Sequence, residues 1–100
     1  MLHIVNRAAF DRAAVDRLLS RIGAGHTLML IENGVYMAKS GSAAAGRLQR
    51  ALSDLTVCAL APDLAARGIM PDEVIAGVAL LDYEGFVDLA VDNAVIHSWR

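Results

Sequence analysis

The chain has 100 residues, of which 56% are hydrophobic and 20% charged, and its formal net charge is −2. This length and composition predict one globular domain over residues 1–100, large enough to fold without a disulfide or a metal. The nine Lys and Arg residues form no basic stripe, so we expect no direct binding of nucleic acid. A mean hydropathy of +0.45 favours an oligomer, because surplus apolar surface has to be covered.

Compartment and membrane association follow from three further features. A single cysteine excludes an internal disulfide and fits the reducing cytoplasm. The opening stretch MLHIVNRAAFDR has neither a basic n-region nor a long apolar h-region, so we expect no signal peptide. No apolar stretch approaches the length of a membrane span. We therefore expect a cytoplasmic protein without a membrane segment.

Short apolar runs and helical periodicity alternate along the first half of the chain. Residues 2–5 predict a strand, and residues 10–22 predict a helix with an apolar stripe at i, i+3, i+4 and i+7. Residues 27–31 read as a strand buried on both faces. Residues 35–38 predict a short helical turn, 42–52 a second helix, and 56–60 a third strand.

The second half continues the alternation. A short helix is predicted over PDLAAR, with Gly68 as its C-cap. Residues 78–81 predict a strand, and Asp82 is placed to cap the helix that follows. The apolar stripe expected on that helix consists of Tyr83, Phe86, Val87 and Ala90. With a last strand over 94–99, the chain is predicted to be an open α/β fold, a mainly parallel sheet flanked by helices.

One loop is a candidate binding site. Glu32, Asn33 and Gly34 follow the second predicted strand, and open α/β sheets bind ligands at the carboxyl ends of their strands. A simple turn explains the same residues, because Asn-Gly is a common turn pair. The GAG at 23–25 predicts a helix stop rather than a nucleotide loop, since Leu28 occupies the place of the third glycine and the segment precedes a strand.

Metal binding and cysteine chemistry both have weak support. His3, His26, His97 and Cys58 show no ligand spacing, so we predict no metal site and no cofactor. Cys58 lies inside an apolar strand without a cationic neighbour in sequence. Burial there raises the pKa of a thiol and leaves it protonated, so Cys58 is predicted to be an inert core residue.

An acidic row occupies the last predicted helix. Glu84, Asp88 and Asp92 fall at i, i+4 and i+8 on one face, where like charges oppose the helix by a few tenths of a kcal/mol per pair. A solvated face explains such a row, and so does a docking face for a basic partner.

Four pieces of the sequence together resemble one family. MLHIVNR opens the chain, ENGVYMA follows the second strand, DLAARG follows the third, and LLDYEGFVDL precedes a terminal Ser-Trp pair. This ordered set is similar to the DsrH/TusB family of sulfur-relay subunits. The resemblance implies a DsrE-like fold and two homologous partner subunits, of the DsrE/TusD and DsrF/TusC types, in a heterohexamer. Such complexes pass persulfide sulfur, either to 2-thiouridine at the tRNA wobble position or in cytoplasmic sulfur oxidation.

The departures from the family pattern bear on the site. Family members often have Ser-Pro-Phe where this chain has Ala8, Ala9 and Phe10, which removes a helix cap worth about 1 kcal/mol. Cys58 matches no sulfur-carrying position of the family. The chain is therefore expected to be a non-catalytic structural subunit, with Tyr36, Tyr83, Phe86 and Trp99 as candidate interface residues. The alternatives are a persulfide carrier through Cys58 and a free-standing homo-oligomer that binds a small ligand.

Overall fold

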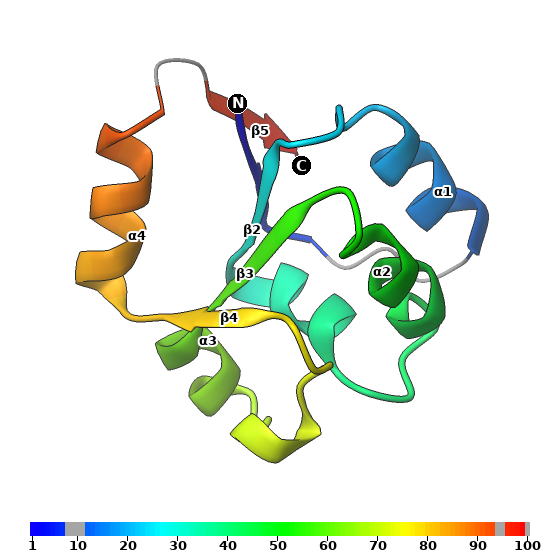
Figure 1. Cartoon of the computed structure of the whole chain (residues 1–100). Coiled ribbons are helices and arrows are strands. Elements are labelled where there is room, and N and C mark those ends of the chain that lie inside the picture. Colours follow the sequence, from blue (N-terminus) through cyan, green and yellow to red (C-terminus); the bar gives the residue numbers. More distant parts are fainter. Residues whose placement is uncertain (8–11, 94–95, 100) are drawn as a thin grey trace.

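The computed structural model describes residues 1–7, 12–93 and 96–99, with Arg12 and residues 96–99 described by their backbone only. Helices and strands alternate as the sequence predicted (Figure 1). The elements, in chain order, are β1 (Leu2–Val5), α1 (Arg12–Ser20), β2 (Thr27–Leu30), the 3₁₀ helix η1 (Glu32–Ala38), α2 (Ala45–Ala51), β3 (Thr56–Leu60), α3 (Ala61–Ala66), the 3₁₀ helix η2 (Pro71–Glu73), β4 (Ala79–Leu81), α4 (Tyr83–Val91) and β5 (Ile96–Trp99).

The sheet has five strands in the order β4-β3-β2-β1-β5, and each neighbouring pair is parallel. The predicted α/β class and parallel sheet are confirmed. β1 and β3 have the predicted bounds, whereas β2 ends and β4 begins one residue inside the predicted range. The helix expected over 42–52 spans only Ala45–Ala51, because turns and a bend occupy residues 41–44. Phe10 and the Ala8-Ala9 departure lie outside the described residues.

Each face of the sheet has its own apolar cluster. The larger cluster joins one face to α1, η1, α2 and α3, and it includes Val15, Leu28, Leu48, Val57 and Leu64. The smaller cluster lies on the opposite face, where Leu2, Met29, Cys58 and Leu60 meet the inner side of α4. Figure 1 shows α4 on the far side of the sheet from α1 and α2. The topology explains this arrangement, because crossover connections between parallel strands are right-handed. The connections from β1 to β4 advance along the sheet in one direction and place their helices on one face. The connection from β4 to β5 runs back in the opposite direction and places α4 on the other face.

The apolar stripe predicted for α4 is wrong in part. Phe86 and Ala90 do pack against the smaller cluster, together with Leu89. Tyr83 and Val87 instead face away from the sheet, with exposed fractions of 60% and 57%. The helix carries two apolar rows at helical spacing, and a single helix lying on a sheet buries only one side. Periodicity gave no reason to prefer one row over the other.

The predicted cap of α4 is confirmed. The Asp82 Oδ1 atom accepts a hydrogen bond from the Gly85 backbone N–H at 2.7 Å. We expect Asp82→Ala to lower the free energy of unfolding by about 1 kcal/mol, because one N–H at the helix start loses its acceptor. Urea denaturation measures this change. Asp72→Ala, at an exposed position in η2, is the control and is expected to change stability by less than about 0.5 kcal/mol. Equal effects of the two substitutions would contradict the capping role.

None of the helices in the described part of the chain combines the length and the apolar character needed to cross a membrane.

Candidate functional site

The predicted binding loop lies at the carboxyl end of β2, where η1 begins. The Glu32 backbone has a left-handed φ of 50°, and its N–H donates to Asp63 Oδ2 at 2.6 Å. Arg67 donates from Nε to Asn33 Oδ1 at 3.0 Å and from Nη1 to the Asp63 carbonyl at 3.1 Å. Hydrogen bonds between residues more than thirty positions apart in sequence thus join the ENGVYMA and DLAARG segments.

Gly34 anchors the other side of this loop. Its N–H donates to the Ile31 carbonyl at 2.8 Å, and the Ile31 N–H donates to the Val5 carbonyl at 3.0 Å. Gly34 is buried, and a Cβ placed on it would collide with the Val5 carbonyl oxygen. Asn6, which follows Val5, has a buried Oδ1 atom that accepts no hydrogen bond from the described residues.

Much of the polar chemistry of the loop is already used within the chain. The Glu32 N–H, the Asn33 amide oxygen and the Asp63 carboxylate all have intramolecular partners. A ligand would therefore have to displace these bonds or use the exposed Glu32 carboxylate. The geometry favours the structural reading of a turn, and the binding role of Glu32, Asn33 and Gly34 stays a prediction.

Cys58 occupies the middle of β3, in register with Met29 of β2. Only 4% of its surface is exposed, and it belongs to the smaller cluster under α4. Burial raises the pKa of the Cys58 thiol, which keeps the sulfur protonated and a poor nucleophile. This environment agrees with an inert core residue.

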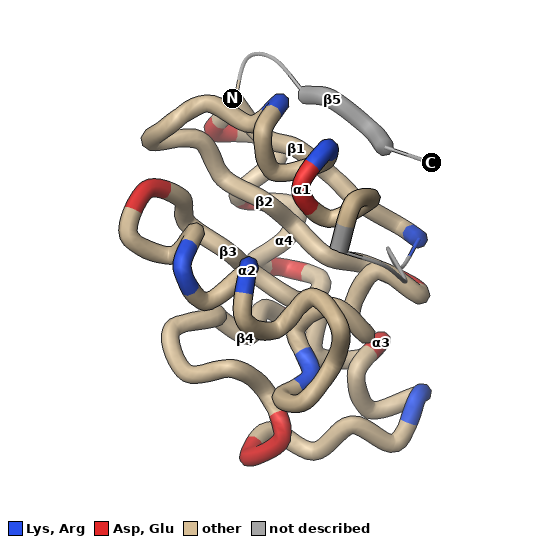
Figure 2. The backbone as a smooth tube through the Cα atoms, turned by 90° about the vertical axis from the view of Figure 1, so that its right-hand side faces the viewer, with Lys and Arg blue, Asp and Glu red and all other residues tan. Residues whose placement is uncertain are grey.

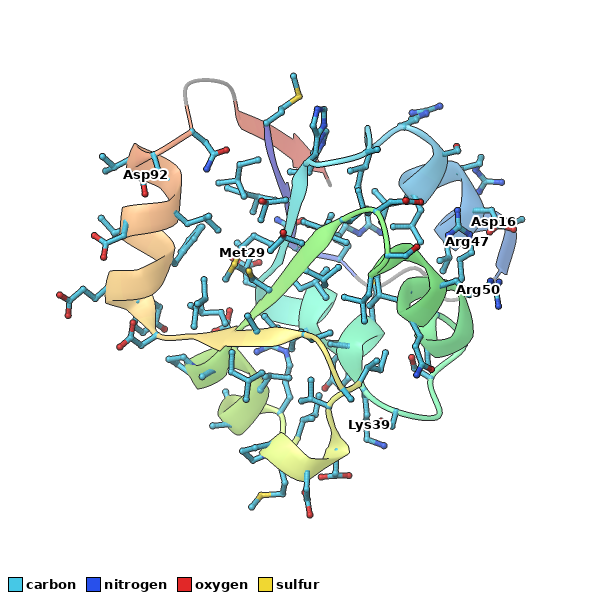
Figure 3. All side chains as sticks on the ribbon, in the orientation of Figure 1. Asp16, Met29, Lys39, Arg47, Arg50 and Asp92 are labelled. Atoms are coloured by element: carbon cyan, nitrogen blue, oxygen red, sulfur yellow. The ribbon has the colours of Figure 1, made fainter. Side chains whose placement is uncertain are left out.

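Two polar pairings were not predicted from the sequence. The His3 Nε2 and His26 Nδ1 atoms lie 3.2 Å apart, so one ring donates to the other. Across the cavity of about 430 Å³ between α1 and α2, Arg47 Nε donates to Asp16 Oδ1 at 3.0 Å (Figure 3). The partners are 23 and 31 residues apart, and no local pattern relates them. Within the described residues, no group of three or more His, Cys, Asp or Glu side chains is placed to hold a metal ion.

The four predicted interface residues do not form one surface. Tyr36 is exposed on η1, whose buried residues belong to the larger cluster, on the face of the sheet opposite α4. Tyr83 is exposed on α4, whereas Phe86 points inward and packs against the smaller cluster. The Trp99 side chain lies outside the described residues.

The outer side of α4 carries two parallel rows of side chains. Tyr83, Val87 and Val91, which we call the apolar ridge, follow each other at i, i+4 and i+8, and Val91 is 77% exposed. Glu84, Asp88 and Asp92, which we call the acidic ridge, run beside them with the same spacing and are all exposed. Figure 3 labels Asp92 at the end of α4 on the opposite side of the molecule from Arg47 and Arg50. Among the predicted interface residues whose side chains are described, only Tyr83 lies on this surface. The sequence therefore predicted the surface only in part.

Solved structures share the architecture. The ychN protein of Escherichia coli superposes with a TM-score of 0.76 at 13% identity, over 98% of this chain and 97% of that one. A protein of unknown function from Methanobacterium thermoautotrophicum superposes with a TM-score of 0.75 at 16% identity, over 98% and 96% of the two chains. The fold is therefore of the DsrE-like α/β class.

Sequence comparison gives the family within that class. A family model described as DsrH like protein matches residues 7–95. Protein TusB of Pectobacterium parmentieri is 35% identical over 99 residues, and Protein TusB of Escherichia coli (strain K12) is 36% identical over 101. Both alignments cover 99% of this chain and the whole of the relative. The chain belongs to the DsrH/TusB family, as its four sequence segments predicted.

Proposed function

We propose that this chain, as one DsrE-like domain over residues 1–100, is a non-catalytic structural subunit of a cytoplasmic sulfur-relay complex. Its partners would be subunits of the DsrE/TusD and DsrF/TusC types, assembled with it into a heterohexamer. The complex would pass persulfide sulfur toward 2-thiouridine at the tRNA wobble position, or serve the related oxidation of stored sulfur. Membership of the DsrH/TusB family supports the assignment to a sulfur relay.

The burial of Cys58 is the observation that carries the non-catalytic role. A persulfide carrier has to present its sulfur to a donor and then to an acceptor, and it reacts as a thiolate. Cys58 is the only cysteine of the chain and is enclosed between the sheet and α4. The transferred sulfur would therefore travel on a cysteine of a partner subunit.

The first test is the native mass of the chain, expressed alone and then together with both partner types. We expect a discrete heterohexamer with two copies of each subunit, formed only on co-expression, because α4 exposes apolar side chains that a partner would cover. Native mass spectrometry gives the stoichiometry directly.

A stable homo-oligomer that ignores both partners would contradict the proposal and favour the free-standing ligand-binding alternative. Within the assembled complex, Cys58→Ala is expected to leave the rate of sulfur transfer unchanged. Loss of transfer with intact assembly would instead favour the persulfide-carrier alternative.

A further inference from the structure

The acidic ridge is only partly compensated within this chain, because the helix dipole favours Glu84, in the first turn of α4, but neither of the other two carboxylates. Glu84, Asp88 and Asp92 repel each other at i, i+4 spacing. Asp88 and Asp92 also stand at the carboxyl end of α4, where the helix dipole is negative. No Lys or Arg occurs from residue 68 to residue 99, and none of the three carboxylates has an ion-pair partner among the described residues.

The apolar ridge beside it exposes large hydrophobic side chains to solvent, and covering them with a partner would be favourable. Tyr83, Val87 and Val91 form a continuous row, and the half-exposed Leu80 of β4 lies just before the helix. Figure 2 faces the other side of the molecule, where Lys and Arg lie along α1 and α2. The described Lys and Arg side chains thus lie outside the region from residue 68 onward that contains α4, although acidic side chains such as Asp16 also occur on the side that Figure 2 faces.

We propose that the outer side of α4 docks on a basic surface of a partner subunit, with the apolar ridge in a groove and the acidic ridge against Arg or Lys side chains at its rim. This inference rests on the proposed function and assigns it an interface. Opposite charges at the edge of an interface fix its orientation and reject wrong partners. Arginine suits such a rim because its guanidinium binds carboxylates in a bidentate manner.

The same charges argue against a second copy of this chain as the occupant. A symmetric dimer buries the same patch of both subunits. Two α4 helices packed in this way would bring six carboxylates together without a cation, since the acidic ridge contributes three from each copy. Like charges brought together at an interface disfavour association, so a chain with a different, basic surface is the better fit.

The experiment compares two charge reversals of equal size in the co-expressed complex. Glu84→Lys with Asp88→Lys changes the acidic ridge, and Asp54→Lys with Asp72→Lys makes the same change in charge at exposed positions outside α4. We expect the first pair to weaken assembly by about tenfold or more. The second pair is expected to leave assembly within about twofold of the unmodified chain. Raising the salt concentration is expected to weaken assembly of the unmodified chain.

The apolar ridge is tested separately. Val87→Ser is expected to weaken assembly on the order of tenfold, whereas Met70→Ser, at a similarly exposed position before η2, is expected to leave it unchanged. Both side chains are exposed, so neither substitution is expected to disturb the fold. Thermal melting of each variant alone verifies this.

Each outcome bears on a different claim. If the unmodified complex assembles but both charge reversals act equally, or neither acts, the α4 interface is wrong while the proposed function stands. If the chain alone forms a homo-oligomer that the α4 variants dissociate, the occupant is a second copy and the inference is wrong. If the unmodified chain never joins the partners, the proposed function fails first and the inference falls with it.

Discussion

Gly34→Ala is expected to lower the free energy of unfolding by about 3 kcal/mol, as overpacking against a backbone atom does. A Cβ at residue 34 would collide with the Val5 carbonyl oxygen. The same Cβ would lie 3.0 Å from the Val5 carbonyl carbon. That carbonyl also accepts the hydrogen bond from the Ile31 N–H, so it cannot move aside without breaking the connection between β1 and the loop. Urea denaturation of the isolated chain measures the loss.

Gly46→Ala is the matched control for this substitution. Gly46 lies within α2, and a Cβ there meets nothing closer than the flexible Arg50 side chain at 3.8 Å. Alanine at this position is expected to raise stability by about 0.4–1 kcal/mol, because it restricts the unfolded chain and favours the helix. If Gly34→Ala were equally harmless, the close approach of η1 to the end of β1 would be refuted.

Alkylation of Cys58 is expected to be at least about a hundredfold slower in the folded chain than in urea, because the thiol reacts only when the structure opens. Burial under α4 both blocks access and raises the pKa of the thiol, so little thiolate forms near neutral pH. The rate of iodoacetamide incorporation, followed by mass spectrometry, measures the protection. Ala65→Cys in a Cys58→Ala background places a thiol at an exposed position of α3 and is expected to react rapidly when folded.

The raised pKa also gives a dependence of stability on pH. Above about pH 8.5 the unfolded thiol loses its proton while the folded one keeps it, so ionisation stabilises the unfolded state. The stability that Cys58 contributes is complete below that pH and is lost as pH rises through the folded pKa. Between pH 8 and 10 the unmodified chain should therefore lose more stability than Cys58→Ala does. Parallel pH profiles of the two chains would contradict the burial of the thiol.

The sequence predicted those parts of the fold that depend on local pattern. β1 and β3 are short apolar runs bounded by polar or turn residues, and their bounds were correct. Asp82 was recognised as a cap because capping depends on the residues directly after it. Both faces of the sheet are covered, so the uninterrupted apolar character of β2 correctly indicated a parallel strand.

The candidate site depends on long-range geometry, which a single sequence does not contain. Arg67 meets Asn33 only because α3 packs beside η1. The outward row of α4 has the same helical spacing as the inward one, so Tyr83 and Phe86 were assigned to one stripe although they lie on different sides. The acidic ridge was the part of this surface that local pattern did reveal, because helical spacing alone brings its members together.

The order of the strands has a consequence for biosynthesis. β1 is made before the other strands of the sheet, and it pairs with β2 on one edge and with β5 on the other. Its partners in β5 lie 94 positions further along the chain, since Leu2 pairs with Ile96. Until those residues leave the ribosome, one edge of β1 presents unpaired backbone groups to any other nascent strand. A stop codon that removes β5 would make this exposure permanent. β5 thus covers an edge of β1 that stays exposed while the other strands of the sheet are being made.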